Sequence, residues 1–210
     1  LEMLENFNPC FVLDLTATPK KESNIISYVD AVQLKNEHMV KLPVIVYNRD
    51  SQAEVLTDAI DLRNKLEEIA NAEYAKTGKY IRPIALFQAQ PKGKEDATTF
   101  EKLRDKLVDA GIPADQIAIR TADVNELKNV ELMSPNCPIR YIITVNALKE
   151  GWDCPFAYIL ASLANKTSQV DVEQILGRIL RLPHTSQHTQ SALNMSYVLT
   201  SSNDFNNTVA

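Results

Sequence analysis

The stretch Tyr141-Ile-Ile-Thr-Val145-Asn-Ala-Leu-Lys-Glu-Gly151-Trp-Asp153-Cys-Pro155 decides how this chain is expected to fold. Its first five residues are mostly β-branched, which predicts a buried strand. The strand leads directly into a polar segment that contains Gly151 and Asp153. Because ligands in open α/β sheets gather beyond the carboxyl ends of the strands, this junction predicts a binding site. Thr144 could donate to a phosphate, Gly151 permits close backbone approach, and Asp153 could accept from a ribose hydroxyl.

Helices and further strands are expected to alternate on both sides of this segment. Ser51 and Glu54 form a capping box for a long helix that stops at Gly78, and Thr98 with Glu101 begins a second helix that ends at Gly111. The sequence predicts a brief helix over 123–129 and β-rich stretches over 28–34 and 39–47. The other expected strands cover residues 11–15, 82–88, 117–119, 158–163 and 196–200. Such alternation predicts an α/β fold, a parallel sheet with helices on both faces.

Composition excludes several classes of protein. The chain has 210 residues, a formal net charge of −5 and three cysteines. No apolar run is long enough to span a membrane, and the three widely separated cysteines favour reduced thiols in a cytoplasmic protein. The net charge gives no support to nucleic-acid binding, so any such contact must be local. His184 and His188 are expected to be surface loop residues, and no metal site is predicted.

The run Gln174-Ile-Leu-Gly-Arg178-Ile-Leu-Arg181 is the clearest chemical motif. Helical spacing would place Gln174, Arg178 and Arg181 on one face of a helix that begins near Ser168 and stops near Pro183. Guanidinium groups carry a permanent charge and a planar fork of donors, which suits the binding of a polyphosphate.

Each motif also has a structural interpretation. The 174–181 run alone could be an amphipathic helix with a basic solvated face. The 144–155 segment could be a turn with a buried Trp152 and a capping Asp153. Thr16-Ala-Thr18-Pro19, which follows the expected strand over 11–15, is common turn chemistry. The order of the three segments along the chain favours the functional interpretation.

Together the three segments resemble motifs of superfamily-two helicases, the DEAD/DEAH-related group. Residues 16–19 resemble motif III, residues 144–155 motif V and residues 174–181 motif VI, while the strand at 84–88 lies where motif IV would be. Within the group, residues 148–155 and 174–183 are most similar to the Res subunits of type III restriction–modification enzymes.

The resemblance implies two RecA-like motor domains that bind ATP and Mg²⁺ between them. Residues 1–28 would end the first domain and 29–210 would form the second. In the nucleotide site, Arg181 would be the arginine finger, Arg178 a second phosphate contact and Gln174 the residue that orients the attacking water. Gly151 and Asp153 would meet the nucleotide.

Nucleic-acid contacts and coupling are implied in the same way. Thr144 would contact the nucleic-acid backbone, and Thr16 and Thr18 would couple the two sites. The implied partners are double-stranded DNA, the first motor domain and a methyltransferase subunit.

Other parts of such an enzyme are missing from this sequence. It contains no Gly-x-x-x-x-Gly-Lys-Ser/Thr loop to hold phosphates and no acidic box to hold the metal. The nuclease motif is also absent, and residues 1–7 read as the end of a helix without a start. We therefore expect a fragment that neither holds nor hydrolyses ATP alone. Another superfamily-two DNA or RNA helicase and a non-catalytic RecA-like scaffold remain alternatives.

Overall fold

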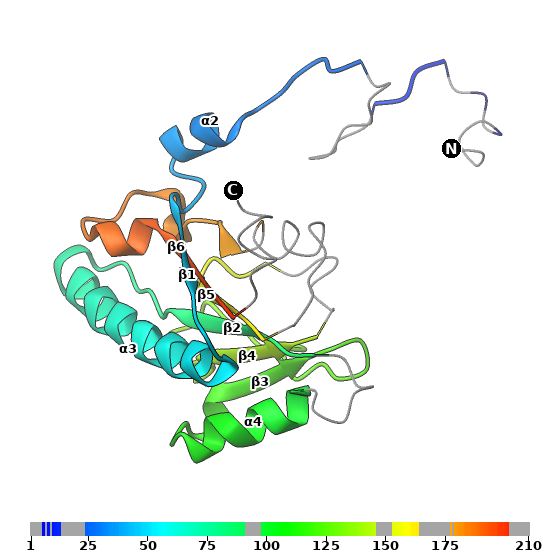
Figure 1. Cartoon of the computed structure of the whole chain (residues 1–210). Helices are drawn as coiled ribbons and strands as arrows, with labels where there is room; N and C mark the ends of the chain where they lie inside the picture. Colours follow the sequence, from blue (N-terminus) through cyan, green and yellow to red (C-terminus); the bar gives the residue numbers. More distant parts are fainter. Residues whose placement is uncertain are drawn as a thin grey trace. The chain divides into compact units, whose positions relative to one another are not determined.

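The computed structural model describes residues 6, 8, 10–13, 24–90, 98–145, 153–163, 177 and 179–201 (Figure 1). The chain divides into two units, Leu1–Asp30 and Ala31–Ala210. The described part of the first unit contains no helix or strand. Whether this unit ends a first motor domain stays a prediction.

A six-stranded, all-parallel sheet forms the centre of the second unit, in the order β1-β6-β5-β2-β4-β3. The strands are β1 (Val44–Asn48), β2 (Ile84–Gln88), β3 (Ile117–Arg120), β4 (Tyr141–Thr144), β5 (Ala157–Ser162) and β6 (Ser196–Thr200). Every residue of β2, β4, β5 and β6 is buried, as expected for a parallel sheet covered on both faces. The predicted fold class is therefore confirmed.

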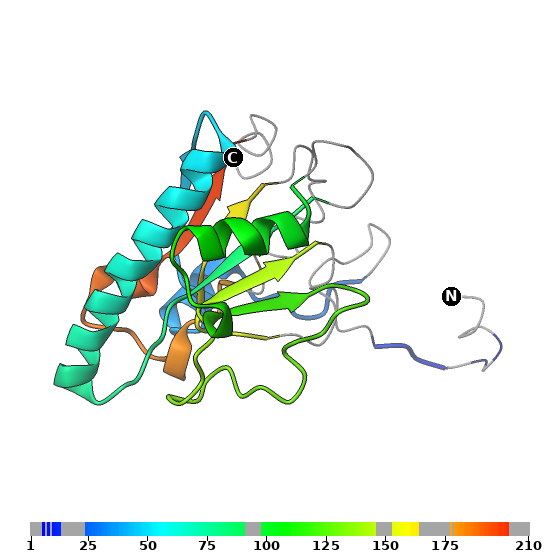
Figure 2. The ribbon, with the colours of Figure 1, turned by 90° about the horizontal axis from the view of Figure 1, so that it is seen from below.

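Two helices cover one face of the sheet (Figure 2). Helix α3 (Gln52–Thr77) contacts β2, β5 and β6, and α4 (Phe100–Asp109) contacts β4. The connection from β1 to β2 contains α3, and the connection from β2 to β3 contains α4; both run toward the β3 edge of the sheet. Because connections between parallel strands are right-handed, both helices lie on the same face. The predicted helix near Ser168 falls largely outside the described residues.

The boundaries of the two long helices follow from their capping residues. The Ser51 side chain accepts from the Glu54 N–H, and Gly78 ends α3 in the left-handed conformation at φ 69°. The cap of α4 is Thr99, one residue later than predicted, because the Thr98 side chain instead bonds Gln52. Short 3-10 turns complete the unit at η1 (Ala114–Gln116), η2 (Pro183–Thr185) and η3 (Ser191–Asn194).

Sequence predictions of secondary structure were wrong at several places. Residues 11–13, the described part of the strand predicted over 11–15, form no strand. Residues 28–34 do not form a strand; helix α2 (Ala31–Asn36) occupies this part of the chain, built from helix-compatible residues and followed by His38 at φ 55°. Residues 123–129 form turns rather than a helix. The Glu126 N–H bonds back to Ile119 O, and Asn129 adopts a left-handed conformation, φ 64°, that a helix does not permit.

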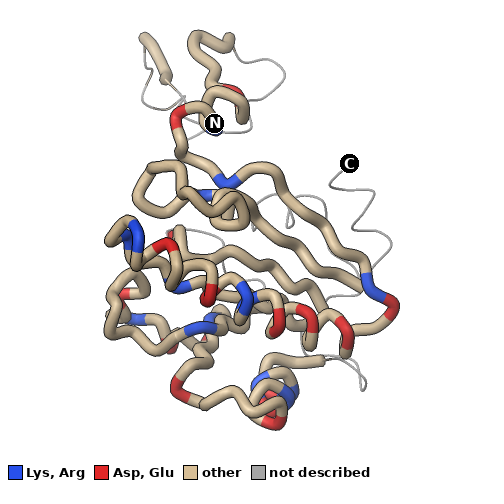
Figure 3. The backbone as a smooth tube through the Cα atoms, turned by 90° about the vertical axis from the view of Figure 1, so that its left-hand side faces the viewer, with Lys and Arg blue, Asp and Glu red and all other residues tan. Residues whose placement is uncertain are grey.

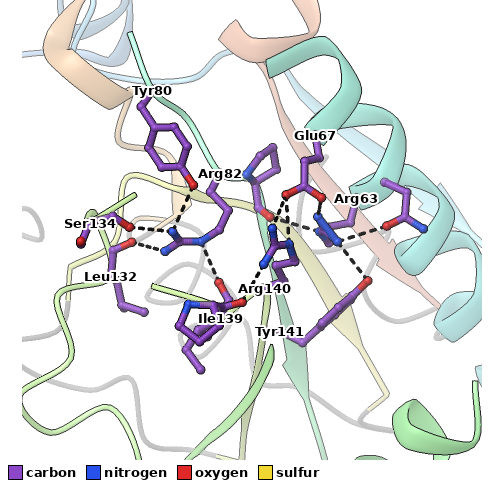
Figure 4. Close-up of polar contacts among 12 residues, drawn as sticks. Arg63, Glu67, Tyr80, Arg82, Leu132, Ser134, Ile139, Arg140 and Tyr141 are labelled. Atoms are coloured by element: carbon purple, nitrogen blue, oxygen red, sulfur yellow. Dashed lines mark hydrogen bonds and ion pairs between the residues drawn. The ribbon is translucent and has the colours of Figure 1, made fainter. Parts of the chain in front are cut away.

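The buried Arg82 holds the irregular connection between β3 and β4 (Figure 4). Arg82 donates to the carbonyl oxygens of Leu132, Ser134 and Ile139. On the side of α3, Arg63 pairs with Glu67, which also accepts from Arg140. The three bonds from Arg82 are charge-assisted and satisfy carbonyl oxygens of the β3–β4 connection, which they help to fix.

Candidate nucleotide-binding site

Two of the predicted site residues, Arg181 and Asp153, form an ion pair. The distance from Arg181 Nη1 to Asp153 Oδ2 is 2.6 Å, although the residues lie 28 positions apart in the sequence. Both side chains are open to solvent, with exposed fractions of 62% and 44%. A guanidinium and a carboxylate are thus presented side by side, in reach of a bound molecule.

The backbone of Arg181 is extended, which corrects the prediction that it continues a helix from Gln174. Arg181 forms an isolated antiparallel bridge with Val40, and the adjacent Leu182 N–H donates to Met39 O at 2.9 Å. Pro183 keeps Leu182, the residue before it, out of the helical region, and Leu182 has φ −80° and ψ 128°. Arg181 therefore cannot share a helical stripe with Gln174 and Arg178.

Lys41 forms hydrogen bonds with the backbone that follows Asp153. The Lys41 ammonium is buried and donates to Pro155 O at 2.8 Å and Ala157 O at 2.7 Å. It also lies 4.1 Å from the centre of the Tyr158 ring. Burial lowers the pKa of Lys41 to about 7, and the neighbouring Cys154 and Asp153 counteract this in part. Sequence reasoning missed Lys41, because a lysine before a strand carries no recognisable signal.

Cys154 is buried next to the ion pair. Burial raises the pKa of its thiol to about 11, with the Lys41 ammonium acting in the opposite direction. The thiol is therefore protonated at neutral pH, and Cys154 acts as a small apolar residue in the core.

Thr144, the predicted nucleic-acid contact, lies at the carboxyl end of β4 with only 1% of its surface exposed. The strand register aligns it with Gln88, which in turn aligns with Ser162, and Ser162 aligns with Thr200. Ser162 Oγ donates to Gln88 Oε1 at 3.0 Å. A row of four buried polar side chains thus crosses the carboxyl ends of four adjacent strands, on one face of the sheet.

This polar row was not predicted, although the sequence contained a signal for it. Each of the four strands is an apolar run that ends in a polar residue, and parallel strands bring such ends together. A second network lies nearby: Gln52 and Gln90 each donate to Leu163 O at 2.9 Å, and Thr98 donates to Gln52. The two networks anchor the loops that leave this edge of the sheet.

Several predicted site residues lie outside the described part of the chain. These are Gln174, Arg178, Gly151, Thr16 and Thr18. Their roles stay predictions.

The two histidines differ from each other. His184 is exposed as expected, but His188 is buried, which corrects its interpretation as a surface residue. Among the described residues, no group of three or more histidine, cysteine or acidic side chains could hold a metal ion.

The surface of α3 differs in charge from the surroundings of the ion pair between Arg181 and Asp153. Figure 3 shows acidic positions along α3, where Glu54, Asp58 and Asp61 belong to the first half of the helix. Although Asp58 pairs with Arg49, this half of α3 is locally acidic, which disfavours binding of a polyanion. Contacts to phosphates are therefore better sought near Arg181 than along α3.

The residues present fit one side of a nucleotide site. Arg181 supplies a forked, permanently charged donor for phosphate oxygens, and Asp153 supplies an acceptor for hydroxyl groups. Both are exposed, so a ligand could exchange the pair for contacts of its own.

No protein-family model matches the sequence, and no curated protein matches it. The fold is nevertheless known: a fragment assigned as the HsdR subunit of a type I restriction enzyme from Vibrio vulnificus superimposes with a TM-score of 0.56 at 19% identity. The match covers 98% of this chain and 42% of the other, so the chain spans about two fifths of that protein's length. The chain thus shares its α/β fold with this restriction-enzyme fragment.

A second solved structure, the ATP-dependent type ISP restriction-modification enzyme LlaBIII bound to DNA, matches with a TM-score of 0.43 at 19% identity. That match covers 80% of this chain and 12% of the other. In the part of the chain that the structure describes, no helix is long and apolar enough to cross a membrane.

Proposed function

We propose that this chain is the second motor domain of an ATP-dependent DNA translocase of a restriction enzyme, with Arg181 as its arginine finger. The observation that carries the proposal is the exposed ion pair between Arg181 and Asp153. Two segments that resemble different nucleotide-binding motifs of one helicase superfamily meet there within hydrogen-bonding distance. The fold match to a restriction-enzyme subunit supports the same function.

Arg181 is suited to stabilise negative charge. Its guanidinium offers a planar fork of donors to phosphate oxygens, and the backbone bridge between Arg181 and Val40 limits where the side chain can reach. ATP, when bound, would supply the phosphoryl group whose transfer to water releases the free energy for movement. A finger carried by a separate domain would make hydrolysis depend on closure of the cleft, which couples chemistry to domain motion.

Asp153 and Thr144 would serve the same motor in different ways. Asp153 would accept from a ribose hydroxyl once nucleotide binding separates it from Arg181. Thr144 is buried, so its proposed contact to the DNA backbone requires its side chain to become exposed or its backbone groups to make the contact.

The finer assignment is a type III enzyme, which cuts DNA together with a methyltransferase subunit. It rests on residues 148–155 and 174–183, whose sequences resemble type III Res subunits more than other helicases. The coding sequence on either side tests it. A nuclease domain downstream would support restriction, whereas its absence would favour a helicase of another pathway.

The finger assignment is tested by the substitution Arg181→Ala in the complete motor protein, with Arg181→Lys as the matched variant. The expected loss of DNA-stimulated ATP hydrolysis is about 10³- to 10⁵-fold for alanine. Lysine should recover little of it, because it keeps the charge but lacks the planar fork. Unchanged ATPase rates in both variants would remove the finger assignment and favour a non-catalytic scaffold.

A further inference from the structure

We propose that Lys41 is the positioning residue of this nucleotide site, holding Arg181 and Asp153 in one place; the inference rests on the function proposed above. Lys41 lies far from both residues in the sequence and belongs to none of the motifs. The Lys41 backbone contacts the segment that carries Arg181, and the Lys41 ammonium contacts the segment that carries Asp153.

The backbone around Lys41 holds the Arg181 segment. The Lys41 N–H donates to Leu180 O, and Met39 O accepts from the Leu182 N–H. Arg181 is thereby fixed between two hydrogen-bonded neighbours. Ser196 at the start of β6 reaches the same place, since its hydroxyl lies 3.4 Å from Lys41 O.

The ammonium of Lys41 holds the Asp153 segment. Its two hydrogen bonds end on the carbonyl oxygens of Pro155 and Ala157, which immediately follow Asp153 and Cys154. An ammonium has three N–H donors, and the remaining side of this one lies over the Tyr158 ring. Lys41 therefore adds a second link between this turn and the Arg181 segment, beside the ion pair between Arg181 and Asp153.

Burying a lysine is costly, which argues that its contacts are needed. A buried ammonium loses hydration, and an apolar residue of similar volume often stabilises a core equally well. The charged and titratable groups that face Lys41 are Asp153, Cys154, Tyr158 and His188. Because burial lowers the pKa of Lys41 to about 7, its charge is partly lost just above neutral pH.

The test uses the complete motor protein and three variants. Lys41→Met keeps the length of the side chain and removes its donors and charge. Arg63→Met is the matched control, since Arg63 is also a buried cation that bonds a backbone carbonyl, at Pro83, but it lies on the α3 side of the sheet (Figure 4). Arg181→Ala measures the effect of removing the proposed arginine finger.

We expect Lys41→Met to lower kcat of DNA-stimulated ATP hydrolysis by about 10- to 100-fold, the scale of a small misplacement of a reacting group. Arg63→Met should lower Tm comparably and leave kcat unchanged at temperatures where every variant is folded. In the wild type, kcat of ATP hydrolysis should fall as the pH rises through about 7, because Lys41 loses its charge. The same decrease of kcat with pH should be absent from Lys41→Met. In the Arg181→Ala background, Lys41→Met should lower kcat by a smaller factor than in the wild type, because only the positioning of Asp153 is then lost.

The outcomes separate the two proposals. If Arg181→Ala is fully active, the proposed function fails, whatever Lys41 does. If Arg181→Ala is inactive while Lys41→Met resembles Arg63→Met in both Tm and kcat, Lys41 has only a structural role and the positioning inference is wrong. Should Lys41→Met not fold, Lys41→Gln is measured in the same way, and its retained N–H donors should give an intermediate kcat.

Discussion

Glu73 and His188 lie together beneath the turns that precede β6, with 3.8 Å between Glu73 Oε1 and His188 Nδ1. Burial alone would raise the pKa of Glu73, but hydrogen bonds from the Thr189 side chain and from the backbone of Thr189 and Gln190 lower it overall. Neither ring nitrogen of His188 has a hydrogen-bond partner among the described residues. Burial lowers the pKa of His188 from 6.5 to about 4, against the opposing effect of Glu73. At neutral pH the pair is therefore a neutral imidazole beside a carboxylate.

This pair predicts a loss of stability in acid. Between pH 6.5 and 4 the unfolded chain binds a proton at His188 that the folded chain does not, so the free energy of unfolding rises with pH across this window. The contribution lost by pH 4 is at most about 3 kcal/mol, since one pKa unit corresponds to about 1.4 kcal/mol. Urea unfolding of the wild type, His188→Gln and the control His184→Gln from pH 7 to 4 measures it. His188→Gln should lose less stability than the other two, and parallel pH dependences of all three would contradict the prediction.

At the scale of elements, helix α3 shows how local signals place a helix. Its start at Ser51 and its end at Gly78 agree with the sequence prediction. Gly78 has a φ of 69°, and a Cβ added there would meet no atom within 4 Å. The requirement for glycine is thus one of backbone conformation rather than space.

Gly78→Ala is therefore expected to destabilise the protein by about 1 kcal/mol, because alanine is strained in the left-handed region. Gly78→Asn should cost less, since asparagine tolerates that conformation. Chemical unfolding of both variants beside the wild type measures the difference. Equal stability of Gly78→Ala and the wild type would show that the helix ends differently in solution.

Other elements show where local signals fail. The 117–119 and 141–145 runs predicted strands that the structure has as β3 and β4, because β-branched residues suit a buried sheet. Residues 123–129 have helical composition, yet their backbone pairs with the end of β3. Arg181 likewise leaves the helical pattern to pair with Val40. In both places a long-range backbone partner outweighed a weak local preference.

For the whole molecule, the sheet order brings together residues from distant parts of the chain. The polar row of Gln88, Thr144, Ser162 and Thr200 forms only because β6, β5, β2 and β4 are neighbours in that register. The ion pair and Lys41 belong to segments that precede β5, β6 and β1 instead. Under the proposed function, the chain would thus provide one wall of a nucleotide site and depend on another domain for the phosphate loop.

The purified 210-residue chain is accordingly expected to show no DNA-stimulated ATP hydrolysis, because its sequence has no loop that could hold phosphates. A phosphate-release assay with and without double-stranded DNA measures this, with the complete motor protein as the positive control. Hydrolysis by the chain alone that disappears in Arg181→Ala would contradict the prediction and would require a phosphate loop of a different kind.

The sequence by itself determined the fold class, most strands and both long helices, because burial patterns and capping residues act over a few positions. It also indicated Arg181 and Asp153 as members of one site, through their resemblance to known motifs. Only the tertiary structure decided that these two side chains pair directly, that Arg181 is extended, and that His188 is buried. It alone revealed Lys41, because a buried ammonium is defined by carbonyl oxygens more than a hundred positions away, to which no local pattern points.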